Sequence, residues 1–368
     1  MGHSRLSPSS AGQWVHCPGS VSMRACFPET GRSQAAEEGT ACHWVGSEVL
    51  LGRGTDPFEG RVAPNNVVIT TEMVDAAKVY VGAVRSLVPL TAKITVEEKL
   101  VIKQIHENCY GTPDCWFFNV GQNELHIWDL KYGYGIVEPV ENWQLICYAI
   151  GALGKVANRN TKITVHIVQP RVPHPMGYDR TWCFMGEELC EYADQLKNAA
   201  LKALSATPGV VSGDHCRYCS ALHACPAARK AALYACDYSD RAIPAKLSPE
   251  GMGVDLMILR KAETRLKSMI SAREGQIIAT QKAGINVPGW AQKHGKGRII
   301  WDKPVEEVLA LGEIMGIDLK APEKAITPAK AGTAGLDSAL IKAYSHAPTT
   351  GITLVPAEKS LASNAFSK

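Results

Sequence analysis

The pattern in this sequence that most directly suggests chemistry is an acidic residue followed two positions later by a lysine. It occurs three times, as Glu97-Glu98-Lys99, Asp129-Leu130-Lys131 and Asp318-Leu319-Lys320. Residues two apart on a β-strand point to the same side. Asp129 and Lys131 lie on the predicted strand 124–132, so their side chains should project together. The third tripeptide has no strand around it and is predicted to lie on the surface.

A second carboxylate should lie beside this pair. The turn sequence Gly111-Thr112-Pro113-Asp114 leads into a predicted strand, residues 114–120, and a hairpin with 124–132 would bring Asp114 next to Asp129. Two carboxylates and the backbone carbonyl of Leu130 form a hard-oxygen site suited to Mg²⁺ or Mn²⁺. Lys131 beside such a metal could orient or deprotonate a water and stabilise a phosphate. The alternative is a hairpin whose Asp and Lys are merely solvated, which is the usual meaning of an isolated Asp-x-Lys.

Two predicted helices carry further polar residues. Gly39, His43 and Ser47 share one stripe of the helix predicted at 33–51. A histidine in such a place is by default a packed or surface residue, but the small Gly39 would let another backbone or a ligand approach it. Gln144 and Tyr148 are four apart on the helix predicted at 141–154 and therefore share one face.

The cysteines indicate a second site. There are twelve, in a chain with no apolar stretch long enough to span a membrane and no signal-peptide core at its N-terminus. We therefore expect a reducing cytoplasm, where disulfides are rare and clustered cysteines more often bind metals. Cys216, Cys219 and Cys225 have ligand-like spacing. With His215 or His223 they could bind zinc, or with a distant cysteine such as Cys17 an iron–sulfur cluster. The other eight are expected to be buried thiols.

The elements that must position these residues follow the order αα-βββ-α-β(β)-α. This order predicts an α/β fold, a mixed β-sheet flanked by helices. One strand is predicted over 92–102, one over 161–170 and one over 178–184, with a helix over 186–204. The 368 residues divide into a predicted domain, 1–240, and a helical, basic C-terminal extension, 241–368, whose last part (325–368) should be loosely ordered.

The charge distribution is compatible with nucleic-acid binding but does not require it. The net charge is +3, and residues 241–368 carry +6 of charge against −3 for the rest. Lys293, Lys296 and Arg298 could bind the phosphates of a DNA strand. Tyr132 or Tyr134, just after Lys131, could stack on an unpaired base, although packing in the core is the commoner role of such residues. The phosphate-loop pattern of NTPases is missing from the sequence, which argues against that class.

Five elements, occurring in order along the chain, resemble the PD-(D/E)XK superfamily of nucleases in its RecB-like form. They are Gly39-Thr40-Ala41-Cys42-His43, Glu97, Gly111-Thr112-Pro113-Asp114, Asp129-Leu130-Lys131 and Gln144-Leu145-Ile146-Cys147-Tyr148. The resemblance covers roughly residues 10–230, is close to a phage-encoded RecB-like family, and implies a restriction-endonuclease-like core.

The resemblance also implies roles for these residues. Asp114, Asp129 and His43 would ligate the metal, and Lys131 would handle the attacking water. Glu97, rather than the adjacent Glu98, would be the acidic residue of the preceding strand. Gln144 and Tyr148 would contact the DNA backbone or brace the centre. Some RecB-like nucleases of the AddB type close the domain with a [4Fe–4S] cluster bound by one cysteine before the nuclease motifs and three after them, which here would be Cys17, Cys216, Cys219 and Cys225.

The expected function is therefore a Mg²⁺- or Mn²⁺-dependent deoxyribonuclease, in particular an exonuclease that resects duplex DNA ends during phage recombination. Its expected partners are DNA and a phage single-strand annealing protein, with no membrane. The sequence is compatible with an oligomer but specifies no interface. Two alternatives stay open, a non-catalytic DNA-binding or scaffold protein and a zinc-containing nucleic-acid-binding module.

Overall fold

A computed structural model describes residues 4–27, 33–53, 58–156, 160–240, 247–296, 300–301, 303–320, 328, 331, 335–346 and 349–356. The chain divides into two compact units, Met1–Ala272 and Arg273–Lys368.

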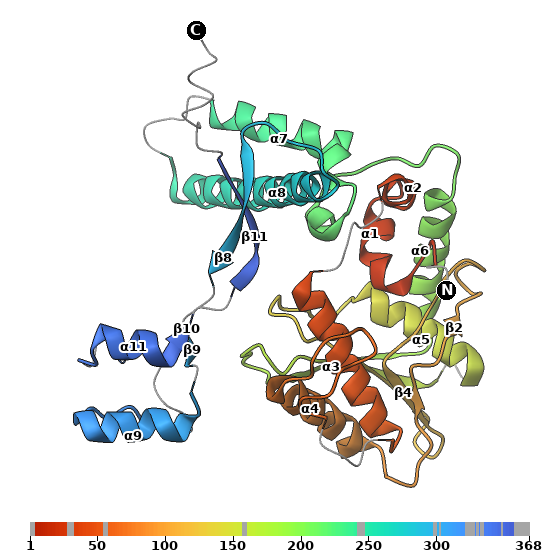
Figure 1. Ribbon diagram of the computed structural model, residues 1–368. Coiled ribbons are helices and arrows are strands. Elements are labelled where there is room, and N and C mark those ends of the chain that lie inside the picture. Colours follow the sequence, from red (N-terminus) through yellow and green to blue (C-terminus); the bar gives the residue numbers. More distant parts are fainter. Residues whose placement is uncertain are drawn as a thin grey trace. The chain divides into compact units, whose positions relative to one another are not determined.

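The first unit is built on a mixed five-stranded sheet, which confirms the predicted fold class (Figure 1). Its strand order is β1-β4-β5-β6-β7, with bounds β1 (Thr95–Val96), β4 (Cys115–Asn119), β5 (Glu124–Leu130), β6 (Lys162–Val168) and β7 (Asp179–Met185). The predicted hairpin is present, because β4 pairs antiparallel with β5, Cys115 opposite Trp128. β6 runs parallel to β5, and the helix α5 (Trp143–Val156) forms the crossover between them.

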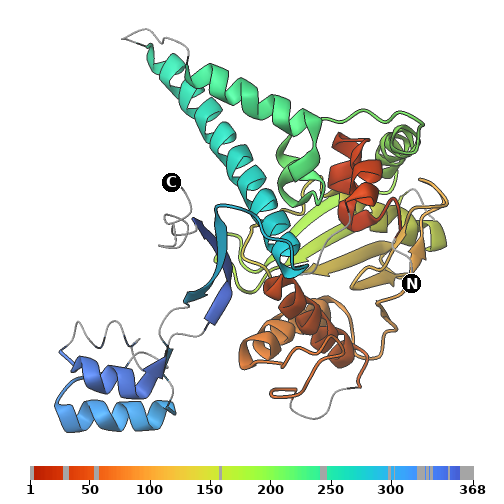
Figure 2. The ribbon, with the colours of Figure 1, turned by 45° about the horizontal axis from the view of Figure 1, so that its top comes forward.

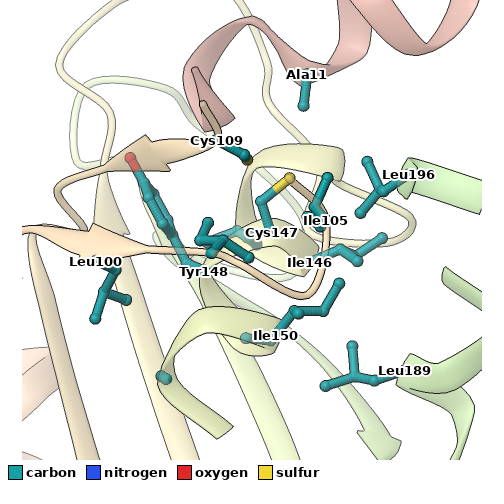
Figure 3. Packing of buried hydrophobic residues seen from close by; sticks show 14 of the residues in the cluster. Ala11, Leu100, Ile105, Cys109, Ile146, Cys147, Tyr148, Ile150, Leu189 and Leu196 are labelled. Carbon is teal, nitrogen blue, oxygen red and sulfur yellow. The ribbon is translucent and has the colours of Figure 1, made fainter. Parts of the chain in front are cut away.

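The two faces of the sheet are covered by different helices, and both are buried. Alternate residues of β5 point to opposite faces. Leu125 and Ile127 face α5, α6 (Glu188–Ala203) and α1 (Ala11–His16). Trp128 and Leu130 face α3 (Gln34–Leu50) and α4 (Thr71–Leu87). Figure 3 shows the first cluster, where Ile146, Cys147 and Ile150 of α5 pack near Leu189 and Leu196 of α6.

The helices that carry candidate site residues have polar N-caps. The Ser33 side chain accepts from Ala36 N at the start of α3, and Thr70 does the same for Met73 N at the start of α4. Asn142 Oδ1 accepts from Gln144 N at 3.1 Å and from Leu145 N at 3.3 Å. Asn142 thereby fixes the start of α5, the helix that contains Gln144.

Two sequence predictions differ from the structure in this unit. The strand predicted over 92–102 is broken into β1 and β2 (Leu100–Val101), which pairs with β3 (Tyr110–Gly111), because Glu97 adopts a left-handed φ of 49°. The earliest predicted helix was the one at 33–51, but the N-terminal residues fold into η1 (Pro8–Ser10), α1 and α2 (Ser20–Cys26). Leu6 and Trp14 are buried in the main core, and this apolar contact outweighs the polar composition around them.

The cysteine-rich segment folds into η2 (Asp214–Tyr218) and η3 (Leu222–Ala224), and two long helices follow it, α7 (Pro226–Ser239) and α8 (Pro249–Lys282). The helices lie side by side (Figure 2), and Tyr238 OH donates to Asp255 Oδ1 at 2.6 Å. Met269 and Ala272 of α8 pack against Leu222 and Ala228. This packing explains why the first unit extends to Ala272 rather than to the predicted boundary at 240. Among the described residues, no helix is long and apolar enough to cross a membrane.

The second unit contains a two-stranded ribbon and a small helical cluster. β8 (Trp290–Lys296) pairs antiparallel with β11 (Thr349–Pro356), and β9 (Ile300–Trp301) pairs with β10 (Ser345–His346). Residues of α9 (Val305–Met315) and α11 (Ser338–Tyr344) pack in one apolar cluster. The segment expected to be loosely ordered therefore contains a helix and a strand, and the strand is rich in the β-branched residues that favour sheets.

Candidate metal centre and cysteine site

Three potential metal ligands from different parts of the chain meet in the first unit. His43 comes from α3, Glu97 from the kink after β1, and Asp114 from the residue before β4. Each offers a ligand atom, and these atoms all lie within 4.8 Å of one another. His43 Nδ1 is 3.1 Å from Asp114 Oδ1. One imidazole nitrogen and two carboxylates are ligands suited to a divalent cation.

The backbone around Asp114 holds its carboxylate in place. Asp114 Oδ2 accepts a hydrogen bond from Leu130 N at 2.7 Å, which ties it to the end of β5. Glu97 N donates to the Asp114 backbone carbonyl at 3.2 Å, so the kink that breaks the predicted strand also aims Glu97 at the site. Irregularities of this kind next to functional sites commonly re-aim a side chain.

The predicted Asp–Lys pair forms beside these ligands. Lys131 Nζ is 2.7 Å from Asp129 Oδ2 and donates to Gln144 Oε1 at 3.2 Å, while Gln144 Nε2 donates to Asp129 Oδ1 at 2.8 Å. The two side chains project together from the end of β5, as the strand period predicts. Asp129 is almost fully buried, and its Oδ2 has the close Lys131 ammonium but no hydrogen bond of good geometry. The Lys131 ammonium is the cation that lies against this oxygen.

The charges in the site are strongly coupled. Burial alone would lower the pKa of His43, but the charge and hydrogen bond of Asp114 outweigh it and raise that pKa to about 9. For Glu97, whose side chain is otherwise exposed, desolvation of the carboxyl and then the charge of Asp114 raise the pKa to about 7. Burial disfavours charge on Lys131, but Asp129 outweighs it and raises the Lys131 pKa, so the ammonium is charged.

Tyr148 braces the turn before Asp114 and does not face solvent. The residue is buried, and its hydroxyl donates to the Thr112 carbonyl at 3.1 Å. A Cβ on Gly111 would lie 2.8 Å from Pro8 Cδ and 3.2 Å from Tyr148 Cε1. The glycine of the GTPD turn is therefore required by the packing. Of the two roles predicted for Tyr148, only the bracing role fits this position.

The candidate DNA-binding residues lie apart from one another, in the core and in the second unit. Tyr132 is only 4% exposed and packs between the sheet and α3, so its ring is not available to a base. Lys293 and Lys296 lie on β8 in the second unit, and Arg298 lies outside the described residues. The backbone carbonyl of Leu130 was predicted as a metal ligand. The backbone contact that Leu130 makes with the site is a different one, the hydrogen bond from its N–H to Asp114 Oδ2.

The cysteine site joins the segment at Cys17 to the segment that begins at Val211. Val211 N donates to Cys17 Sγ at 3.3 Å, and Gly213 N donates to Cys216 Sγ at 3.3 Å. Burial would raise the pKa of Cys17 and Cys216, but hydrogen bonds from His215 and from the backbone outweigh it and lower both pKa values. A Cβ on Gly19 would lie 2.5 Å from Val210 Cγ1, so Gly19 permits this close approach.

Cys219 and Cys225 belong to the same region, packed with Cys216 around Leu222. The structure describes all four predicted cysteines, and in any three of them at least one pair of sulfurs is more than 4.8 Å apart. Tetrahedral zinc ligands with Zn–S bonds of ~2.3 Å would be about 3.8 Å apart. Among the described residues, no three of these thiols lie as close together as the ligands of one zinc ion.

A family model described as "Protein of unknown function (DUF2800)" matches residues 3–330. The chain belongs to the DUF2800 family. The match includes both candidate sites and most of the second unit.

Sequence reasoning missed three contributions to the centre of this DUF2800 protein. Glu97 was predicted as the acidic strand residue of the site but not as a metal ligand, and its carboxylate lies in the ligand group with His43 and Asp114. The cap by Asn142 was missed, although an Asn two residues before Gln144 is a recognisable helix start. The Leu130 N–H could not be found from sequence, because every residue has one.

Proposed function

We propose that this chain is a divalent-metal-dependent phosphodiesterase that cleaves DNA. The observation that carries the proposal is the meeting of His43, Glu97 and Asp114 within 4.8 Å beside the Asp129–Lys131 pair. A metal bound by carboxylates next to a fixed ammonium is an arrangement suited to attack on a phosphodiester. The resemblance of the five motifs to RecB-like PD-(D/E)XK nucleases supports DNA as the substrate.

The donor set fits Mg²⁺ or Mn²⁺. His43, Glu97 and Asp114 would hold the ion, and Asp129, whose Oδ2 is paired with the Lys131 ammonium, would be the further ligand that the resemblance implies. When bound, a divalent cation would neutralise the scissile phosphate and acidify a water. His43 must lose its proton to bind metal, so binding should release protons below pH 9.

Lys131 acts in this proposal as a cation and hydrogen-bond donor. Its raised pKa keeps it protonated, so it orients the attacking water and stabilises charge on the phosphate rather than removing a proton. Gln144 holds Lys131 and Asp129 at once and fixes their relative position. Tyr148 and the Leu130 N–H hold the Asp114 segment.

The cysteine site is proposed to hold a structural [4Fe–4S] cluster. Cys17, Cys216, Cys219 and Cys225 would be its ligands, and the backbone N–H groups at two sulfurs would stabilise thiolates there. The resemblance to AddB-type nucleases, with one cysteine before the motifs and three after them, favours the cluster over zinc. Iron and acid-labile sulfide analysis after anaerobic purification tests this assignment, and stoichiometric zinc would contradict it.

A cleavage assay with Mg²⁺ or Mn²⁺ on linear duplex, single-stranded and circular DNA tests the activity and separates exonuclease from endonuclease action. Lys131→Ala and Asp114→Asn should reduce cleavage by at least the ~10²–10³-fold typical of losing one electrostatic catalytic group. Lys320→Ala, from the Asp-x-Lys tripeptide of the second unit, is the matched control and should cleave normally. Equal cleavage by wild type and Lys131→Ala would refute the proposal, and DNA binding without cleavage in wild type would favour a scaffold role.

Exonucleolytic resection for phage recombination, with a single-strand annealing protein as partner, is the more specific form of this proposal. This more specific proposal rests on the resemblance of the five motifs to RecB-like nucleases. Stable association with such a protein, measured with purified components, is its test.

A further inference from the structure

The loop that follows Lys131 is held rigidly by one buried side chain. Gln169 is fully buried just after β6, and its Nε2 donates to the carbonyls of Gly133 and Gly135, both at 2.8 Å. Its Oε1 accepts from Val137 N at 3.3 Å and from Arg180 Nη2 at 2.7 Å. Backbone clamps of this kind fix a loop whatever side chains it carries.

This clamped loop presents an aromatic ring to solvent. Tyr134, between the two clamped glycines, is 67% exposed. Arg171 covers part of it, with its guanidinium carbon 4.1 Å from the ring centroid and a hydrogen bond to the tyrosine hydroxyl. Arg171 is itself fixed, because it lies 4.2 Å from the Tyr132 ring and its Nε is 2.9 Å from Glu72 Oε1. The orientation of the exposed ring is thus determined by the protein.

The position of the ring relates it to the proposed metal centre. β5 and β6 run parallel, so the loop with Tyr134 and the segment with Gln169 and Arg171 leave the same edge of the sheet. Lys131 lies at that edge, three residues before Tyr134. The loop that carries Tyr134 therefore leaves the sheet at the same edge as Lys131.

We propose that Tyr134 is a stacking platform for an unpaired nucleobase of the DNA strand being cut. The proposal rests on the proposed function and specifies its substrate as a single-stranded segment or end. A tyrosine ring stacks on any base, and an arginine against the ring adds an attractive cation. Bases inside a duplex are already stacked and do not offer a face, so intact duplex would not use this site.

Binding of a short fluorescein-labelled oligothymidine, with Ca²⁺ replacing Mg²⁺ to prevent cleavage, tests the proposal by fluorescence anisotropy. Tyr134→Ala should weaken binding roughly 5- to 150-fold, the ratio equivalent to ~1–3 kcal/mol for one stacked base. Tyr134→Phe and Tyr134→Trp should bind like wild type. Tyr234→Ala, which removes a 60% exposed tyrosine near Lys230 on α7, is the matched control and should have no effect.

An oligonucleotide with abasic sites identifies the contact as a base contact. Abasic substitution should weaken binding to wild type and leave binding to Tyr134→Ala unchanged. Wild-type affinity in Tyr134→Ala, or equal losses from abasic substitution in both proteins, would overturn the stacking role. That failure differs from failure of the proposed function, in which wild type and Lys131→Ala would cleave DNA equally.

Discussion

At the scale of single residues, Gln144 is the side chain on which the arrangement of the centre most depends. Its two amide atoms contact Lys131 and Asp129 simultaneously, so it sets the direction of both. Neither residue of the pair is free to turn toward a different partner without breaking a contact to Gln144. A side chain of this kind acts by positioning other residues, and its removal should affect turnover more than folding.

We therefore expect Gln144→Ala to reduce the DNA cleavage rate by about 10- to 100-fold, the usual effect of losing an outer-shell partner. The midpoint of thermal unfolding should change little, because Gln144 is only half buried. Steady-state cleavage and differential scanning fluorimetry measure the two effects. Gln122→Ala, in the β4–β5 turn, is the control with unchanged activity. Full activity in Gln144→Ala would show that the bridge is incidental.

A second residue-scale effect concerns acid stability. Burial, and then the neighbouring His166, lower the pKa of His126 below its ordinary value. Its Nδ1 is 3.2 Å from His166 Nε2, and its Nε2 is 3.5 Å from Glu124 Oε2. The other oxygen of that carboxylate, Oε1, binds Lys162 Nζ. A histidine kept neutral by folding is protonated more readily in the unfolded chain. The folded state therefore loses stability as pH falls below about 6.5.

His126→Gln should make the free energy of unfolding less dependent on pH below about 6.5, by at most ~1.4 kcal/mol per pH unit. Above pH 7 the free energies of unfolding of wild type and His126→Gln should depend on pH in the same way, because His126 is then neutral in the folded and the unfolded protein. Urea denaturation of wild type and variant across this range measures the difference. Parallel curves for the two proteins would contradict the assignment.

At the scale of secondary-structure elements, the centre depends on close approach between a turn and a helix. Gly111 lies against Pro8 and Tyr148, so the N-terminal segment, the GTPD turn and α5 meet where no side chain can be added. Gly82, on α4, has open space where a Cβ would be placed. Replacing each glycine with alanine therefore distinguishes two effects on stability: overpacking at Gly111, and loss of backbone freedom in the unfolded chain at Gly82.

We expect Gly111→Ala to lower the free energy of unfolding by about 1–3 kcal/mol through overpacking. Gly82→Ala should raise it by ~0.5–1 kcal/mol, because alanine favours a helix interior over glycine. Chemical denaturation measures both. Equal effects of the two substitutions would show that the turn can relax away from Tyr148.

At the scale of the whole molecule, the cysteine site connects segments that are far apart in the sequence. Gly19 N donates to the Gly209 carbonyl at 2.8 Å, so α2 begins against the segment that leads into the cysteine loop. A cluster bound by Cys17 and the downstream cysteines would close nearly the whole first unit into one covalent loop. Closing so long a loop restricts the unfolded chain strongly.

Cys17→Ser should abolish iron and sulfide binding and lower the free energy of unfolding by about 3–5 kcal/mol, by analogy with the loss of a covalent cross-link across a long loop. Limited proteolysis should then cut the N-terminal helices first. Cys236→Ser, at an exposed cysteine of α7, is the control and should keep iron content and stability. A Cys17→Ser protein with full iron content would exclude Cys17 as a ligand.

Patterns that repeat over a few residues were sufficient to determine much of this protein from sequence. They determined the helices at α3 and α4, the β4–β5 hairpin, the joint projection of Asp129 and Lys131, and the shared face of Gln144 and Tyr148. These features follow from local geometry, because strand and helix periods fix which neighbours face the same way.

Packing between segments distant in the sequence determined the features that the sequence did not predict. The kink at Glu97, the burial of Tyr132 rather than Tyr134, and the folding of the N-terminal residues into the core depend on segments distant in sequence. Arg171 and Gln169 acquire their contacts with the loop after Lys131 only because β6 pairs in parallel with β5. Which side chains meet in space depends on how the whole sheet and its helices exclude water together. Local spacing contains no information about that outcome.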